Sequence, residues 1–390
     1  MPSSTTAAGV ELPAISPRRA RGAAYAVDGA PGAARDLQEV CLGARVFVSM
    51  PFLEGVTPRV LREHAGSASY PCDEPLERRH GVFRVDEIGL PLFDHGLLYG
   101  DSVFEGVLVV DGRLFLWREH LERLHASARR LRISVPYDDV DLTRHTLEAV
   151  EAMGLAAGDR AYVRLVVSRG LGDLGINPRK CLGSTVYAIA AKLAVYPEAA
   201  YRRGIAVSVS RNVRRNGQDN VDPRVKSSNY LNNILALLDT IDEGTLETMM
   251  LTRDGYVSEA TADNLFLVSR EPGWEADPAK VTVSTPTEDY CLNGITRQLL
   301  MRIAAEEGHA VRVLRNMLPS DWRGPDREAF LTGTGAGLMA VTAVDGQALG
   351  EGEAGPVTRR LRERFLAELA DPANGVAVGA SDEAIRAYLS

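Results

Sequence analysis

The chain of 390 residues is 45% hydrophobic, which is enough apolar material for two hydrophobic cores, so we expect two domains. The formal net charge of -8 and the sequence pI near 5.5 argue against a nucleic-acid-binding surface. The four cysteines form no C-x-x-C pair and no apolar run reaches membrane-spanning length, so we expect a cytoplasmic protein without a metal site, disulfide framework or membrane segment.

The first 80 residues are expected to form an N-terminal extension. Residues 1–35 are rich in Ala, Gly, Pro, Ser and Arg, a composition typical of a disordered or loosely docked segment. A small domain is then predicted over residues 81–195, from a mixture of helices and mainly antiparallel strands. Its predicted elements are strands at 107–110, 114–116, 161–167 and 185–189, with a two-residue turn at Asp111-Gly112, and helices at 118–132 and 140–153.

A connector at residues 196–203 leads into a large domain predicted over residues 204–370. A turn at Asp254-Gly255 is expected to join two of its strands, 248–252 and 264–268. Residues 371–390 form a C-terminal tail for which the composition predicts no element. The other predicted elements are strands at 205–209, 310–313 and 329–332 and helices at 229–241, 295–307 and 356–369.

Lys226 is one of four lysines in a chain whose 44 basic residues are otherwise arginines. A lysine amine can become a neutral nucleophile and form a Schiff base, whereas an arginine side chain stays protonated at any working pH. Most lysines are solvated surface charges. Because Lys226 is kept in so arginine-rich a chain, directly before a predicted helix, it is a candidate for covalent chemistry.

Two glycine–threonine turns have the composition of a phosphate-binding site. Residues 292–296 open the predicted helix at 295–307, and residues 333–335 follow an apolar strand. Unpaired N–H groups at a helix start, a hydroxyl group and the helix dipole favour an anion. Taken alone, each turn is more often a helix cap or an ordinary loop. The chain has no G-x-x-x-x-G-K-[ST] motif, which argues against a nucleotide hydrolase.

Two charged residues add to this pattern. Glu259 lies between two apolar strands, where a buried carboxylate needs a cation, and a protonated pyridine nitrogen would satisfy it. Arg123 comes two residues after Leu121, off the apolar face of its predicted helix, so periodicity favours a solvated position. A Schiff-base lysine, two phosphate-type turns, an additional arginine and a buried acid would together make a pyridoxal phosphate site.

Six segments, in order along residues 81–366, resemble the class IV (fold-type IV) aminotransferases, and most closely the branched-chain amino acid aminotransferases. The resemblance implies an α+β fold with a smaller N-terminal α/β domain and a larger C-terminal β-rich pseudo-barrel domain flanked by helices. It also implies a transaminase that depends on pyridoxal 5′-phosphate, and a homodimer, because the family builds each site near a subunit interface. The segments are residues 93–106, 123–128, 226–233, 259–266, 294–297 and 331–334.

The resemblance further implies a role for each matching residue. Lys226 would be the catalytic residue, holding the cofactor as an internal aldimine and moving a proton between the substrate Cα and the cofactor C4′. Glu259 would bind the pyridine nitrogen and Tyr230 the phenolic oxygen. Arg123, Ile295, Thr296 and Thr334 would bind the phosphate, and Leu292, Gly294 and Gly333 would complete the cofactor site. The substrate-binding residues would be Tyr99, Phe104, Gly106, Tyr162, Arg164, Gly335 and Ala336.

The choice of substrate depends on less specific signals. Residues 162–164 resemble the Tyr-x-Arg of L-specific branched-chain enzymes, and the loop at 168–178 lacks the histidine of D-amino acid transaminases. The predicted reaction moves an amino group between an L-amino acid, branched-chain or related, and a 2-oxo acid such as 2-oxoglutarate. Gly337 and Ala340 depart from the family pattern, which leaves the substrate open. The alternatives are a lyase of the aminodeoxychorismate type, a D-amino acid or amine transaminase, and a non-catalytic protein that keeps the fold.

Overall fold

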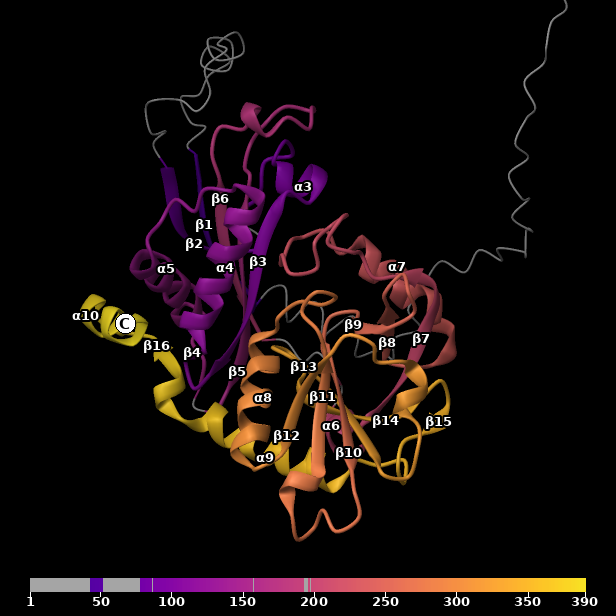
Figure 1. The fold of residues 1–390 in the computed structure, drawn as a ribbon. Coiled ribbons are helices and arrows are strands. Elements are labelled where there is room, and N and C mark those ends of the chain that lie inside the picture. The colour runs from indigo at the N-terminus through magenta and orange to yellow at the C-terminus, as the bar shows by residue number, and fades with distance from the viewer. Residues whose placement is uncertain (1–42, 52–77, 86, 157, 193–195, 197) are drawn as a thin grey trace, which may run out of the picture. The chain divides into compact units, whose positions relative to one another are not determined.

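The computed structural model describes residues 43–51, 78–85, 87–156, 158–192, 196 and 198–390 (Figure 1). All of them belong to one compact unit of the chain, Val40–Ser390. Of the extension expected over residues 1–80, residues 1–42 and 52–77 lie outside the described residues, whereas Arg45–Pro51 forms a strand of the first sheet. Within the described part of the chain, no helix is both long and apolar enough to cross a membrane.

A seven-stranded antiparallel sheet carries the first half of the described chain (Figure 1). Its central hairpin turns at Asp111-Gly112, as predicted, and both residues have the positive φ angles (48° and 71°) that favour such a two-residue turn. In spatial order the strands are β16 (Gly375–Ala377), β4 (Arg113–Phe115), β3 (Ser102–Val110), β5 (Arg160–Ser168), β6 (Thr185–Ala191), β1 (Arg45–Pro51) and β2 (Arg78–Arg84).

Helices α4 (Trp117–Leu131) and α5 (Asp139–Glu151) pack against this sheet with the apolar faces that the periodicity predicts. The short helix α3 (His95–Tyr99) precedes β3. Residues 371–390, for which composition predicted no element, form β16 and helix α10 (Asp382–Leu389). Both elements pack with the first sheet, because Val376 of β16 and Ile385 of α10 are buried in its core.

A nine-stranded mixed sheet carries the second half (Figure 1). Side chains alternate between its two faces: Phe266 and Phe330 pack with α8 and α9, while Leu265 and Leu331 belong to the core on the other face. The strands in spatial order are β12 (Ala310–Leu314), β11 (Val281–Pro286), β10 (Asn264–Arg270), β13 (Arg327–Gly333), β14 (Gly337–Val344), β7 (Ile205–Arg214), β8 (Glu247–Leu251) and β9 (Val257–Ala260), and β15 (Gln347–Ala348) pairs with β14. The helices are α6 (Glu198–Arg203), α7 (Leu231–Thr240), α8 (Ile295–Glu306) and α9 (Pro356–Ala370), and short 3-10 helices lie at Pro178–Lys180, Ile241–Glu243, Pro278–Lys280, Pro319–Trp322 and Pro372–Asn374.

These two sheets with their packed helices confirm the predicted α+β class, but four strands of the second sheet were not predicted, namely β9, β11, β14 and the two-residue β15. β9 has only four residues, β11 alternates apolar residues with Ser and Thr, and β14 begins in a glycine-rich turn. The turn at Asp254-Gly255 therefore leads from β8 into β9 and not into β10, which corrects the prediction. As a consequence, Glu259 lies within a strand of the sheet and not in a loop between strands.

Candidate active site

Lys226 lies in the segment between β7 and α7, and the first sheet and its helix hold its backbone. Its N–H donates to Oγ of Ser127 on α4 at 3.2 Å, and its carbonyl accepts from the N–H of Phe104 on β3 at 3.0 Å. Beside it, Oγ of Ser102 donates to Oγ of Ser228 at 2.6 Å. Because both backbone polar groups are bound, residues far away in the sequence set the direction of the Lys226 side chain.

The Lys226 amine lies against two aromatic rings. Nζ is 4.6 Å from the ring centroid of Phe104 and 6.0 Å from that of Tyr230, and it lies 3.4 Å from the Tyr230 hydroxyl. The two rings contact each other, with their centroids 5.5 Å apart. Rings in these positions keep water from part of the amine and leave its remaining side for a ligand.

A cleft beside Lys226 holds about 480 Å³ of space free of protein atoms, part of it open to solvent. Lys226, Tyr230, Glu259 and Leu292 are the predicted cofactor-binding residues on its lining. They come from three segments that are distant in the sequence. The structure therefore brings the amine and the acid to one cavity, as the pyridoxal phosphate hypothesis requires.

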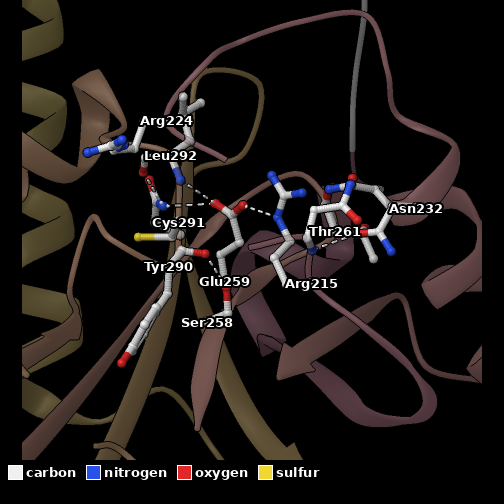
Figure 2. A network of polar contacts seen from close by, with 12 residues as sticks. Arg215, Arg224, Asn232, Ser258, Glu259, Thr261, Tyr290, Cys291 and Leu292 are labelled. Carbon is white, nitrogen blue, oxygen red and sulfur yellow. Dashed lines mark hydrogen bonds and ion pairs between the residues drawn. The ribbon is translucent and has the colours of Figure 1, made fainter. Parts of the chain in front are cut away.

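Glu259 is buried on β9 and is bound by the chain's own donors (Figure 2). Its Oε1 accepts from Nε of Arg215 at 2.7 Å. Its Oε2 accepts from the N–H of Leu292 at 3.1 Å and from Nδ2 of Asn264 at 3.3 Å. A buried carboxylate requires a cation, and Arg215 supplies one. A pyridine nitrogen would therefore share this carboxylate with Arg215.

The first glycine–threonine turn is the N-terminus of α8, as predicted. Gly294 is the N-cap residue and no side chain caps the helix there. Within the described ranges, the N–H groups of Ile295 and Thr296 have no hydrogen-bond partner. A Cβ on Gly294 would lie 2.2 Å from Oδ1 of Asn264, so the close approach needs glycine. Free N–H groups at the positive end of a helix fit the phosphate of the expected cofactor.

Arg123 turns inward, contrary to the position that helix periodicity favours. Nη1 donates to the carbonyl of Asn293 at 3.0 Å, and Nε and Nη2 bind the two carboxylate oxygens of Glu105 at 2.9 and 2.7 Å. Nδ1 of His120 lies 2.7 Å from the same carboxylate. Burial raises the pKa of Glu105, but the Arg123 charge and the hydrogen bonds from Arg123 and His120 outweigh it and lower the pKa to about 2. An ionised Glu105 thus holds Arg123 beside the α8 turn.

The second glycine–threonine turn does not open a helix, so the helix-dipole part of that prediction is wrong. Residues 334–336 form the hairpin turn between β13 and β14. A Cβ on Gly333 would lie 1.8 Å from Oδ1 of Asp263, a buried residue that lines the cleft. Burial and the charge of Glu247 raise the pKa of Asp263 to about 7. Asp263 therefore joins this hairpin turn to the cleft beside Lys226.

The predicted substrate residues on β3 and β5 lie next to Lys226. Arg164 packs over the ring of Phe104, with 4.5 Å between its guanidinium carbon and the ring centroid. Tyr162 covers Gly106, since a Cβ there would lie 2.0 Å from the tyrosine hydroxyl oxygen. β3 and β5 pair so that Gly106 is opposite Arg164. The glycine thus makes room for the phenol of Tyr162 beside the Phe104 ring.

Tyr99 has a different position from the other predicted substrate residues. It ends α3, is 36% exposed, and donates its hydroxyl to the carbonyl of Leu174. Its ring packs edge-on against His95, with centroids 5.0 Å apart. Within the described chain, none of the seven predicted substrate residues is on the lining of the cleft that contains Lys226 and Glu259. Tyr99 differs from the other six in its contacts with His95 and Leu174.

Arg215 and Glu105 are among the residues of the site that sequence reasoning missed. Arg215 follows β7 in a polar stretch without periodicity, so nothing in the pattern distinguished it from the neighbouring arginines. Glu105 had a usable signal: a carboxylate within the apolar strand Ser102–Val110 requires a cation, by the argument applied to Glu259. That argument would also have predicted that an arginine such as Arg123 turns inward.

Comparisons with known proteins give one family match and several similar relatives. A family model described as amino-transferase class IV matches residues 102–344. A branched-chain-amino-acid aminotransferase of Pseudomonas aeruginosa is 32% identical over 276 residues, which cover 70% of this chain and 85% of that protein. A relative in Methanocaldococcus jannaschii, to which the same activity is assigned provisionally, is 38% identical over 275 residues, or 70% of this chain and 89% of the relative.

Solved structures are similar over most of the chain. The crystal structure of Escherichia coli branched-chain amino acid aminotransferase has a TM-score of 0.66 at 29% identity and covers 74% of this chain and 91% of that chain. A second branched-chain amino acid aminotransferase, crystallised with pyridoxamine 5′-phosphate, has a TM-score of 0.68 at 29% identity and covers 76% of this chain and 96% of that chain.

Proposed function

We propose that this chain, which belongs to the class IV aminotransferases and depends on pyridoxal phosphate, moves an amino group between a branched-chain or related L-amino acid and a 2-oxo acid such as 2-oxoglutarate. One observation carries the proposal: the Lys226 amine and the Glu259 carboxylate line the same cleft. Similarity to relatives that are named branched-chain-amino-acid aminotransferases supports the substrate class. A lyase or a D-amino acid transaminase is not favoured by these relatives.

The residues of the cleft are suited to hold the cofactor by both of its ends. When bound, pyridoxal phosphate supplies an electron-withdrawing ring that stabilises negative charge at the substrate Cα. Glu259, which Arg215 holds in place, would bind the ring nitrogen. Tyr230 would bind the phenolic oxygen. The phosphate would lie at the α8 N-terminus, where the ligands would be Arg123, Ile295, Thr296 and Thr334, with Leu292, Gly294 and Gly333 completing the site.

Lys226 would act twice, as the attachment point of the cofactor and as the base of the reaction. Its amine would take a proton from the substrate Cα and deliver it to C4′ of the cofactor. The rings of Phe104 and Tyr230, which pack beside Nζ, exclude water from this transfer. The backbone contacts with Ser127 and Phe104 keep the amine directed into the cleft.

The substrate would lie between β3, β5 and the hairpin turn that follows β13. Arg164 and Tyr162 would bind or surround its polar end, while Phe104 and Gly106 would shape the space for its side chain. Gly335 and Ala336 would present backbone N–H groups to its carboxylate. This arrangement recognises the carboxylate through the main chain, so one site could accept both the amino donor and the 2-oxo acid acceptor.

We also propose that the chain forms a homodimer, because large apolar side chains are exposed on two surfaces. A contiguous apolar surface on a globular protein usually marks an interface. Nε2 of His95 lies 2.9 Å from the carbonyl of Asp173, which joins α3 to the loop between β5 and β6. The first surface, which we name the loop surface, consists of Leu97, Leu98, Leu174 and Ile176, and the second is the outer face of α7, with Leu231, Ile234, Leu235 and Leu238.

The proposed function is tested by reduction of the cofactor-loaded protein with borohydride, followed by peptide mapping and a screen of donors and acceptors. We expect a single labelled peptide that contains Lys226, and conversion of the bound cofactor to the amine form on addition of an L-branched-chain amino acid or glutamate. Release of pyruvate without consumption of a 2-oxo acid would indicate the lyase. Failure of every amino acid to change the cofactor spectrum would contradict the transaminase.

A further inference from the structure

Two tyrosines on the segment between the two sheets lie close to the hairpin turn of the site. Tyr196 is buried, and Tyr201 on α6 is half-buried against the core of the second sheet. Their rings meet edge to face, with centroids 6.5 Å apart at an interplanar angle of 78°. The guanidinium carbon of Arg362 on α9 lies 5.8 Å from the Tyr201 ring. Neither tyrosine has a role in the site described so far.

Tyr201 fixes one peptide group of the turn. Its hydroxyl donates to the carbonyl of Gly335 at 3.2 Å. In a trans peptide the carbonyl and the following N–H point in opposite directions, so the N–H of Ala336 points away from Tyr201. In the part of the chain that the structure describes, this N–H has no hydrogen-bond partner. Ala336 is buried, and a buried donor is costly unless a ligand accepts from it.

Tyr196 supports the other side of the same turn through a carboxyl group. Its hydroxyl lies 3.1 Å from Oδ2 of Asp263, to which it donates. Oδ1 of that carboxyl approaches Gly333 so closely that a Cβ there would lie 1.8 Å away. Tyr201 thus bonds to the middle of the turn directly, whereas Tyr196 bonds to Asp263, which lies against Gly333 at the start of the turn. The connecting segment therefore supports the turn at two places.

We infer that Tyr201 is a positioning residue for the transamination, and that it presents the N–H of Ala336 to the α-carboxylate of the substrate by fixing the Gly335 carbonyl. The inference rests on the proposed function, in which Gly335 and Ala336 bind the substrate. Because the α-carboxylate is common to amino acids and 2-oxo acids, loss of the Tyr201 hydroxyl weakens the binding of donor and acceptor alike. The side chain of the substrate makes no difference to this effect.

The test is Tyr201→Phe in the cofactor-loaded protein, since this variant removes only the hydroxyl group. The probe is 4-methylvaleric acid, which has a carboxylate but no amino group, so its Kd from titration calorimetry requires no turnover. We expect this Kd, and the KM values of donor and acceptor, to rise about three- to tenfold, which is the effect of one lost hydrogen bond. Cofactor retention and kcat should change by less than about twofold.

Tyr388→Phe is the matched control. The Tyr388 hydroxyl accepts a backbone hydrogen bond from the Trp117 N–H at 3.0 Å, and both residues pack with the core of the first sheet. This variant should bind 4-methylvaleric acid as the wild type does. If the wild type transaminates and Tyr201→Phe leaves Kd and KM unchanged, the inference is wrong and the proposed function stands. A fall in kcat at constant KM would also contradict it. If the wild type neither transaminates nor binds the acid, the proposed function itself fails.

Discussion

The contacts that hold the Lys226 segment in place involve its backbone. Its side chain can therefore be replaced without loss of the local fold. Ser127 and Phe104 bind only its N–H and carbonyl. Lys226→Arg keeps the positive charge, but a guanidinium cannot form a Schiff base. We expect aminotransfer to fall by at least about a thousandfold. Borohydride reduction should no longer attach the cofactor to the protein, which is measured by mass spectrometry of the peptide.

Lys192→Arg is the control for this substitution. Nζ of Lys192 lies 2.7 Å from Asp159 and its side chain is 60% exposed, so the same change of residue occurs outside the cleft. It should keep activity and labelling. Substantial aminotransfer by the Lys226 variant would contradict the catalytic role of that residue.

Asp263 predicts a pH dependence of stability. Burial and the Glu247 charge raise its pKa to about 7, against 3.8 for an ordinary aspartate, and Tyr196, Lys226 and Glu259 also face it. Because the pKa is higher in the folded state, the protonated group stabilises the fold at low pH, and this contribution is lost as the pH rises towards 7. Asp263→Asn stays uncharged, so its free energy of unfolding should fall less than that of the wild type between about pH 5 and pH 8.

Urea denaturation of the cofactor-loaded protein at each pH measures this difference. Asp239→Asn is the control: hydrogen bonds from Asn212, Arg211 and Ser210 outweigh the effect of burial and lower the pKa of Asp239 to about 2. Its effect on stability should therefore be constant over the same range. Parallel pH profiles for the wild type and Asp263→Asn would show that Asp263 does not titrate in this window.

At the scale of elements, the apolar period predicted helices better than strands. Leu121, Leu124 and Ala128 recur at helical spacing and are buried on α4. β9 has four residues and carries Glu259 of the site, and β11 alternates apolar residues with Ser and Thr, so apolar patterning could not detect them. A strand that contains residues of the site is harder to predict, because its sequence departs from the apolar alternation of a core strand.

Contacts between elements position the other residues of the site, and the local sequence contains little information about such contacts. Arg123 lies off the apolar stripe of its helix, yet Glu105 on β3 binds it in the interior. Arg215, in the segment that follows β7, meets Glu259 on β9 at 2.7 Å. In both cases the two partners are brought together by the packing of elements and not by their spacing in the sequence. The family resemblance supplied Arg123 and Glu259, because motifs record tertiary contacts that periodicity does not, but it assigned no role to their partners Glu105 and Arg215.

The hairpin between β13 and β14 can be tested through Gly333. A Cβ there would lie 1.8 Å from Oδ1 of Asp263, so Gly333→Ala must displace the turn or the carboxyl. We expect a loss of about 1–3 kcal/mol in the free energy of unfolding, typical of overpacking. Dissociation of the cofactor should also be faster, because Thr334 moves with the turn. Chemical denaturation and the rate of cofactor release measure the two effects.

A double-mutant cycle identifies the contact. Asp263→Ala removes the atom that a Cβ on Gly333 would meet, so the Gly333→Ala substitution should cost less in the Asp263→Ala background. Gly89→Ala, at an exposed position with no atom within 4 Å of the new Cβ, should be nearly neutral. Additive effects of the two substitutions would show that Gly333 is needed for another reason.

At the scale of the whole molecule, the position of Tyr99 suggests that one chain does not complete its own site. Tyr99 ends α3 and donates its hydroxyl to the carbonyl of Leu174, so it is held within the loop surface. Ile176 on the same surface is 81% exposed, and burial in a dimer would remove that apolar area from water. A two-fold dimer places the same surface of each chain against its copy. The interface could therefore bring Tyr99 to the site of the partner subunit.

Complementation between variants tests this arrangement. Tyr99→Ala keeps Lys226, and Lys226→Arg keeps Tyr99, so each homodimer should be nearly inactive. If Tyr99 serves the partner's cleft, a mixed dimer has one cleft with both native residues and one with neither. Random exchange of subunits would then restore roughly a quarter of the wild-type activity. If Tyr99 served its own cleft, both clefts of the mixed dimer would stay defective and mixing would restore nothing. Adding Ile176→Glu to both variants, which places a charge on the loop surface, should yield monomers in analytical ultracentrifugation and abolish the recovery.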